Sequence, residues 1–312
     1  MSYLITALYL GWSLGANDAA NIFGTAVSSK MVRFTTAIIL SSIFVILGSI
    51  IEGKNGIETI SSISAMDLTT AGISSLSAAI SVTIMTVLKL PVSTSQAVVG
   101  SIVGVGIMQK HIALTGLSKI LVCWVGTPIG ACIISIILYL LLAKFLNRLR
   151  LSIWDYDFVM RAGLIITGCY GAYALGANNV ANVTAVFYGA GLLSIETAAL
   201  IGGASIALGI LTFSKGVMNT VGKGIVKLDA YSAFIVVLSN AITVHVYAGI
   251  GVPVSTSQAV VGAILGIGLL KRAEALKKRS VVGVFSGWIA TPIIAALFSV
   301  FIYFITHLKY VG

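Results

Sequence analysis

The sequence predicts an all-α polytopic membrane protein built from two inverted-topology repeats of about five membrane helices each, with broken helices and re-entrant hairpins. Of 312 residues, 58% are hydrophobic and 9% are charged, against roughly 25% charged in an ordinary soluble domain. The apolar stretches lack the alternation that lipid-facing strands require, so helices remain. A net charge of +10 would suit a nucleic-acid binder, but the basic residues lie in short segments between apolar stretches rather than on one solvated face.

Two segments occur twice along the chain and indicate an internal duplication. LGANDAAN at 14–21 is echoed by LGANNVAN at 175–182, and PVSTSQAVVG at 91–100 recurs unchanged at 253–262. Self-similarity at a nearly fixed spacing is the signature of a repeated architecture. The expected units are a first inverted repeat at 1–150 and a second at 151–312.

Apolar stretches in the first half define its membrane segments. They cover about 3–27, 35–51, 60–88, 95–109 and 117–146, and the second half repeats the series up to about residue 306. Trp124, ahead of a Thr-Pro pair, has its counterpart in Trp288, ahead of another. Five segments per half is an odd number, so the second half must enter the membrane from the opposite side, as in many secondary transporters.

The distribution of lysine and arginine predicts the orientation in the cell membrane. The loops at 28–34, 144–161, 214–228 and 271–280 hold 14 of the 19 basic residues. Cytoplasmic loops carry the excess of these residues, so we expect these four loops in the cytoplasm and both termini outside it. The first apolar stretch follows no basic region, and we expect it to stay in the mature protein.

The first repeated motif places polar residues inside an apolar stretch. We expect the helix to break near Gly15 and to expose backbone groups at membrane depth. An unpaired Asp18 there costs at least about 2.5–3.5 kcal/mol, so it should be protonated or hold a cation. Asn17 and Asn21 add carbonyl oxygens, which suit sodium or a proton-linked water better than a soft metal. The alternative is that Asp18 bonds an asparagine across a helix interface.

The second motif, PVSTSQ, places proline and hydroxyls where a helix can begin. The stretch after each copy spans about 22 Å as a helix, short of the roughly 30 Å of hydrocarbon, so we expect re-entrant hairpins whose tips meet near the midplane. Free amides, the helix dipole and hydroxyls at two facing tips could enclose a tetrahedral oxyanion. The alternative is ordinary capping with helix–helix hydrogen bonds. The predicted anion ligands are Ser93, Thr94, Ser95, Gln96, Ser255, Thr256, Ser257 and Gln258.

Positive charge near these motifs is scarce. Lys89 precedes the first PVSTSQ, and its counterpart in the second half is Gly251, which excludes a symmetric basic clamp. Helix ends and a co-bound cation must then offset the anion's charge. Because the two ligands would improve each other's binding, this favours symport.

The remaining polar residues have weaker interpretations. His245, six residues or so ahead of the second hydroxyl segment, could relay protons or simply bond a neighbouring helix. Asp67, Glu58, Glu196 and Glu52 lie near expected helix ends and are expected as interfacial or capping groups. Glycines at 100, 104, 262 and 266 are typical of close helix packing. The absence of a catalytic triad order, zinc spacing or Walker loop predicts that the protein is not an enzyme and holds no cofactor beyond a coupling cation.

The pairing of GANDAANIFGTAV with a later GANNVAN, and of two PVSTSQA segments, resembles the PiT family of inorganic phosphate transporters. GKNGIETI at 53–60 is also similar to a polar segment of that family. The resemblance implies cation-coupled uptake of inorganic phosphate by a homodimer. It implies that both PVSTSQ segments, with Asn21 and Asn182, bind phosphate. The implied cation ligands are Asp18, Asn17, Asn178 and Asn179.

One departure from the family pattern concerns charge. The family usually has aspartate in both GAND motifs, whereas Asn179 occupies that position in the second motif here. The stoichiometry and the choice between Na⁺ and H⁺ therefore stay open.

Our leading hypothesis is a secondary active importer of inorganic phosphate that works by alternating access. The rival is a permease of the same fold for sulfate or another tetrahedral oxyanion. Phosphate can still donate a hydrogen bond, and a carboxylate acceptor such as Asp18 would disfavour sulfate. A passive anion channel lacks a charged lining here, and a non-transporting receptor lacks a signalling domain.

Overall fold

The protein is a bundle of helices in the computed structural model, which describes residues 3–63, 66–88, 92–111, 114–149, 151–218, 228–271 and 278–308. Within these ranges every regular element is a helix. The helices of the first half are α1 Leu4–Asp18, α2 Ala20–Ser28, α3 Phe34–Glu52, α4 Lys54–Ser61, α5 Leu68–Val87, α6 Thr94–Gln109 and α7 Leu114–Arg148. Those of the second half are α8 Ile153–Gly189, α9 Ile195–Phe213, α11 Ala230–Ile250, α12 Thr256–Leu270 and α13 Lys278–Leu308.

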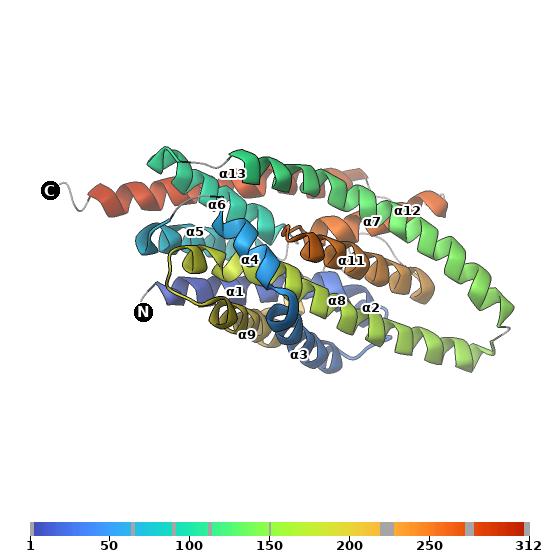
Figure 1. The fold of residues 1–312 in the computed structure, drawn as a ribbon. Coiled ribbons are helices and arrows are strands. Elements are labelled where there is room, and N and C mark those ends of the chain that lie inside the picture. The colour runs from blue at the N-terminus through green and yellow to red at the C-terminus, as the bar shows by residue number, and fades with distance from the viewer. Residues whose placement is uncertain are drawn as a thin grey trace.

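The predicted all-helical membrane fold is confirmed. Seven of the described helices are long and apolar enough to cross a membrane. The longest, α8, has 37 residues and extends about 55 Å, well beyond the roughly 30 Å of a hydrocarbon core. In Figure 1, α1 begins and α13 ends at the same end of the bundle, and α7 connects to α8 at the opposite end.

Two helical hairpins occupy equivalent places in the two halves. One is formed by α5 and α6, the other by α11 and α12, and in each the second helix is short, with 16 residues in α6 and 15 in α12. Asp67 caps α5 by accepting a hydrogen bond from the Thr70 amide. Asp229 caps α11 by accepting one from the Ser232 amide. The capping role expected for Asp67 is therefore confirmed.

The helices that carry the repeated GAN motifs pack against partners from the other half. A Cβ on Gly15 of α1 would lie 1.9 Å from the Ile206 backbone oxygen of α9. A Cβ on Gly176 of α8 would lie 2.0 Å from the Val45 backbone oxygen of α3. Glycine is therefore needed at both positions because the backbones touch. Each GAN motif is thus held rigidly against a long helix.

The two hairpins are packed in the same close manner. Gly100 of α6 faces the Pro292 backbone of α13, and Gly262 of α12 faces the Pro128 backbone of α7. These contacts confirm the packing role predicted for the glycines of α6 and α12. Since α7 and α13 each flank the short helix of one hairpin, they form the outer wall of the bundle on that side (Figure 1).

Two expectations about element boundaries are wrong. The first helix is not interrupted at Gly15 but four residues later, at Ala19 between α1 and α2, where the backbone keeps helical dihedrals of φ −53° and ψ −31°. The equivalent segment in the second half lies inside the unbroken α8. Gly15 serves close packing against α9. The apolar stretch expected at 60–88 is divided instead, because α4 ends at Ser61 and α5 begins at Leu68.

Candidate substrate-binding site

The PVSTSQ segments form the N-terminal turns of α6 and α12. Ser93 accepts a hydrogen bond from the Gln96 amide, and Ser255 accepts one from the Gln258 amide, each at 3.2 Å. Both serines have extended backbone and are followed directly by helix. The prediction that these segments start helices is confirmed.

The two hairpin tips contact each other. The Ser95 hydroxyl donates to the Val254 carbonyl at 3.0 Å, and the Ser257 hydroxyl donates to the Val92 carbonyl at 3.1 Å. Each hydroxyl thus reaches the backbone just ahead of the other hairpin's short helix. Two tips from opposite halves therefore meet in the interior, as the hairpin interpretation predicts.

Asn17 and Asn178 attach the tips to the GAN helices. The Asn178 carboxamide accepts from the Val254 amide at 3.0 Å and donates to the Val252 carbonyl at 3.2 Å. Asn17 accepts from the Val92 amide at 3.3 Å. Both side chains are at most 1% exposed. In this conformation these two amides, predicted as cation ligands, hold the backbone of the tips.

Asp18 lies at the junction between α1 and the first tip. Its carboxylate accepts from the Thr94 hydroxyl at 3.3 Å and from the Asn21 amide at 3.4 Å. Asn21 also donates to the Thr256 hydroxyl of the second tip at 3.1 Å. Asp18 is 2% exposed, so a buried carboxylate faces hydroxyls of both hairpins.

Asn179 and Asn182 form the matching arrangement on α8. The Asn182 amide donates to the Asn179 carbonyl oxygen at 2.8 Å and to the Ser95 hydroxyl at 2.9 Å. Two of their buried atoms, Asn179 Nδ2 and Asn182 Oδ1, have no hydrogen-bond partner. Buried polar groups in proteins are almost always paired, so these atoms indicate a place where a ligand or water binds.

Asn240 of α11 is a site residue that sequence reasoning missed. It is 2% exposed, and its amide donates to the Asn21 backbone carbonyl at 3.2 Å while its own carbonyl oxygen has no partner. The signal was a lone asparagine inside an apolar stretch. It has no repeat to draw attention to it, since Ala78 stands at the equivalent position.

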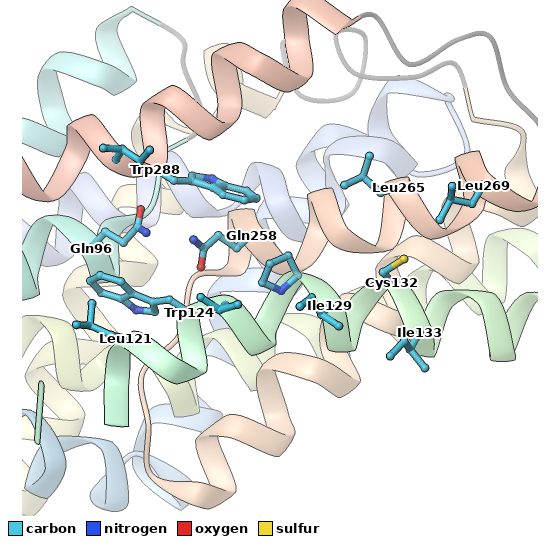
Figure 2. A pocket seen from close by; sticks show the side chains of 13 residues that line it. Gln96, Leu121, Trp124, Ile129, Cys132, Ile133, Gln258, Leu265, Leu269 and Trp288 are labelled. Atoms are coloured by element: carbon cyan, nitrogen blue, oxygen red, sulfur yellow. The ribbon is translucent and has the colours of Figure 1, made fainter. Parts of the chain in front are cut away.

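Gln96 and Gln258 make no hydrogen bond to the Asp18 carboxylate among the described residues. They line a cavity of about 830 Å³ together with Trp124 and Trp288, and all its lining residues belong to α6, α7, α12 and α13 (Figure 2). Both Gln carbonyl oxygens are buried without a hydrogen-bond partner. The eight predicted anion ligands therefore fall into three groups. Ser93 and Ser255 cap the short helices, and the two glutamines face the cavity. The other four contact the opposite tip or the GAN helices: Thr94, Ser95, Thr256 and Ser257.

Few charged groups approach this centre. No hydrogen bond or ion pair between a lysine or arginine and a site residue occurs among the described residues, and Lys89 lies outside them. The described part of the chain also holds no group of three His, Cys, Asp or Glu side chains that could bind a metal. The remaining polar groups are oxygen atoms, which suit a hard monovalent cation as ligands, and amide and hydroxyl groups, which can donate hydrogen bonds to an oxyanion.

This arrangement is that of a multi-pass membrane transport protein with inverted repeats, whose polar site lies where two hairpin tips meet. The chain belongs to the phosphate transporter family, because the family model PHO4, "Phosphate transporter family", matches residues 14–157 and again 154–299.

Similar proteins of known sequence cover nearly the whole chain. A protein of Methanocaldococcus jannaschii described as a "Putative phosphate permease" is 33% identical over 94% of this chain and 93% of its own length. The sulfate permease CysP of Bacillus subtilis is 29% identical over 95% of this chain and 84% of its own. A solved structure described as "The sodium-dependent phosphate transporter" matches with a TM-score of 0.89 at 24% identity, covering 99% of this chain and 100% of that one.

Proposed function

We propose that the protein is a cation-coupled symporter that imports inorganic phosphate across the cell membrane by alternating access. The observation that carries this proposal is the meeting of the two hairpin tips at one buried carboxylate, Asp18, beside the unpartnered amide atoms of Asn179 and Asn182. Ligand sites of inverted-repeat transporters lie at the interface of the repeats, and alternating access moves one part against the other around that site.

The proposed phosphate ligands are the tip hydroxyls with the asparagines beside them. Ser95 and Thr256 already bond Asn182 and Asn21, so an oxyanion would replace these contacts with equivalent ones. The proposed cation ligand is Asp18, helped by the Asn179 carbonyl oxygen. With a single carboxylate at the centre, a bound cation would leave the site neutral before the anion enters.

Sodium is the coupling ion we favour. The solved structure of the same fold is described as sodium-dependent, and the oxygen donors around Asp18 suit sodium. We further propose that both termini lie outside the cytoplasm, from the lysine and arginine distribution, and that two copies assemble as a homodimer.

Sulfate is the second candidate substrate, because one relative is a sulfate permease. The two ions differ in hydrogen bonding: phosphate at neutral pH carries at least one P–OH group, whereas sulfate carries none. A carboxylate that accepts a hydrogen bond from P–OH is left unpaired by sulfate, and such a loss can disfavour the wrong ligand by orders of magnitude. Asp18 is therefore the proposed selectivity residue.

The test is competition for phosphate counterflow in proteoliposomes by unlabelled arsenate and sulfate. We expect arsenate to compete and sulfate not to. Asp18→Asn should lower the affinity for phosphate at least about tenfold relative to the affinity for sulfate, since a hydrogen bond to a charged group is worth about 1.5–3 kcal/mol.

Thr184→Val is the matched control for this test, since Thr184 is buried in α8 and bonds only its own helix, at the Val180 carbonyl. Equal competition by sulfate and phosphate in the wild-type protein would refute the phosphate assignment. Unchanged selectivity with lost cation dependence would assign Asp18 to the cation alone.

A further inference from the structure

Four titratable side chains from three helices meet outside the site described above. His245 of α11 has its Nε2 atom 2.7 Å from the Glu52 carboxylate of α3 and its Nδ1 atom 2.7 Å from the Tyr170 hydroxyl of α8. The Tyr173 ring lies edge-on to the imidazole, with ring centroids 5.7 Å apart. Both nitrogens of one imidazole are therefore engaged by two different helices. Glu52 is the last residue of α3, near a helix end as expected, and it pairs with His245.

The cluster lies at an apolar surface of the bundle. The side chains of His245 and Glu52 are 30% and 38% exposed. Ile51 and Val246, their neighbours in sequence, are more than half exposed, as expected for residues that face lipid. A carboxylate at such a surface is costly unless it is paired, and Glu52 is paired with His245 and with the Tyr173 hydroxyl.

The other repeat has the same framework without the carboxylate and the imidazole. The positions equivalent to Glu52, Tyr170, Tyr173 and His245 are occupied by Phe213, Tyr9, Trp12 and Thr83. There, Trp12 packs against Phe213 with centroids 5.4 Å apart. Since an apolar aromatic contact fills this place in one half, packing alone does not explain the carboxylate and imidazole in the other.

His245 connects the second hairpin to a rigid pair of helices. Its helix, α11, ends at Ile250, directly before the tip that Asn178 holds. The partners Glu52 and Tyr170 stand on α3 and α8, whose backbones touch at Gly48 and Gly176. Movement of the second hairpin relative to this pair must break or rearrange the His245 contacts.

Few other charged groups face the imidazole. Within the described residues, the titratable groups placed against His245 are Glu52 on α3 and the two tyrosines on α8. Lys54 of α4 pairs with Glu58 at 3.9 Å, and Tyr247 of α11 faces α7 at Gly126.

We propose that His245 and Glu52 form a proton-binding latch that holds the second hairpin more firmly when the imidazole is protonated. In the neutral form, Nε2–H donates to Glu52 and Nδ1 accepts from the Tyr170 hydroxyl. A proton taken up from solvent at Nδ1 gives an imidazolium whose two N–H groups donate to Glu52 and to the Tyr170 oxygen. The bond to the Glu52 carboxylate is charge-assisted in both states, and protonation adds the attraction between imidazolium and carboxylate, so acid tightens the latch.

The proposal rests on the proposed function in one respect: it takes movement of the second hairpin to be a step of transport. The direction of the pH effect follows from the chemistry of imidazole. Imidazole is the side chain whose charge ordinarily changes between pH 5 and 8, so mild acidification should slow the hairpin.

The first test reads the histidine directly. The chain has three histidines, so isotope labelling of histidine gives at most three imidazole signals in nanodiscs, and His245→Gln identifies the one of interest. We expect acidification to change this signal and Glu52→Gln to alter its response to acid, whereas Glu52→Gln should leave the other two signals as they are. A signal that is insensitive to Glu52→Gln, or to acidification, would overturn the proposal.

The second test compares the proteins at two pH values. The ratio of phosphate uptake at pH 5.5 to that at pH 7.5 should be about threefold to tenfold lower in the wild-type protein than in His245→Gln. Phosphate speciation is the same for both proteins and cancels in this comparison. Thr83→Val, at the equivalent position of the first hairpin, should keep the wild-type ratio. Equal ratios in wild type and His245→Gln would refute the latch.

Hydrogen exchange separates failure of the latch from failure of the proposed function. At pH 5.5, without phosphate, peptides from α11 should exchange more slowly in the wild-type protein than in His245→Gln, and the difference should shrink at pH 8. If this difference appears but no protein takes up phosphate, the proposed function fails and the latch stands. If uptake occurs and the exchange difference is absent, the latch fails alone.

Discussion

Replacement of Asn178 by leucine tests how the second hairpin tip is held. The substitution keeps the size of the side chain but removes its bonds to the Val254 amide and the Val252 carbonyl. Both backbone groups belong to residues that are fully buried, so no water replaces the lost partner without a rearrangement. Each buried group left unsatisfied costs about 1–3 kcal/mol, or about 2–6 kcal/mol for the pair.

That cost should appear as a loss of apparent affinity for phosphate. If only the held tip is competent to bind, 2 kcal/mol lowers the competent fraction by about 30-fold and raises the half-saturating concentration by the same factor. Asn17→Leu, which removes the bond to the Val92 amide of the first tip, should also raise the half-saturating concentration.

The assay combines phosphate uptake with hydrogen exchange of peptides that contain Val254. In Asn178→Leu the Val254 amide should lose its protection, whereas in Thr184→Val, a buried substitution in the same helix, it should keep it. An unchanged half-saturation together with unchanged protection would refute the assignment of Asn178 to the tip.

Three further predictions concern packing, charge and capping. Gly15→Ala would place a Cβ 1.9 Å from a backbone oxygen and should destabilise the protein by about 1–3 kcal/mol or more in thermal unfolding, whereas Gly130→Ala, where no atom lies within 4 Å, should not. Asn179→Asp adds a second carboxylate to the site and should steepen the dependence of uptake on cation concentration; an unchanged slope would place the cation elsewhere. The Thr70 hydroxyl and amide hold the pKa of Asp67 below its usual value, so this cap stabilises the protein above about pH 4 and is lost as pH falls through that lowered value. In thermal unfolding, Asp67→Ala should cost about 1 kcal/mol at pH 7 and progressively less as the pH falls below about 4.

The repeats made most of the architecture predictable from the sequence. Two identical PVSTSQ segments in oppositely oriented halves required two tips to meet, and Ser95 and Ser257 make that contact. Composition and apolar stretches were enough for the membrane helices. The positions of Asp18 and Asn182 beside the tips followed from the pairing of both motifs in each half.

The directions of the side chains at the start of a helix could not be predicted from the sequence. Thr94 and Gln96 are two residues apart, yet one bonds Asp18 and the other lines the cavity next to Trp124, because successive helical residues point to different sides. Gly15 suggested a helix break because glycine has two uses, and only the position of α9 decides between them. Asn240 was missed because no repeat or neighbouring polar cluster distinguished it.

Uptake of labelled phosphate into proteoliposomes, with sodium and proton gradients imposed separately, tests the central claim most directly. We predict that phosphate accumulates above equilibrium when the sodium concentration is higher outside the proteoliposomes than inside. Collapse of the sodium gradient should abolish this accumulation, and Asp18→Asn should weaken it. Phosphate that merely equilibrates under both gradients would contradict coupled transport, and accumulation of sulfate in its place would contradict the substrate.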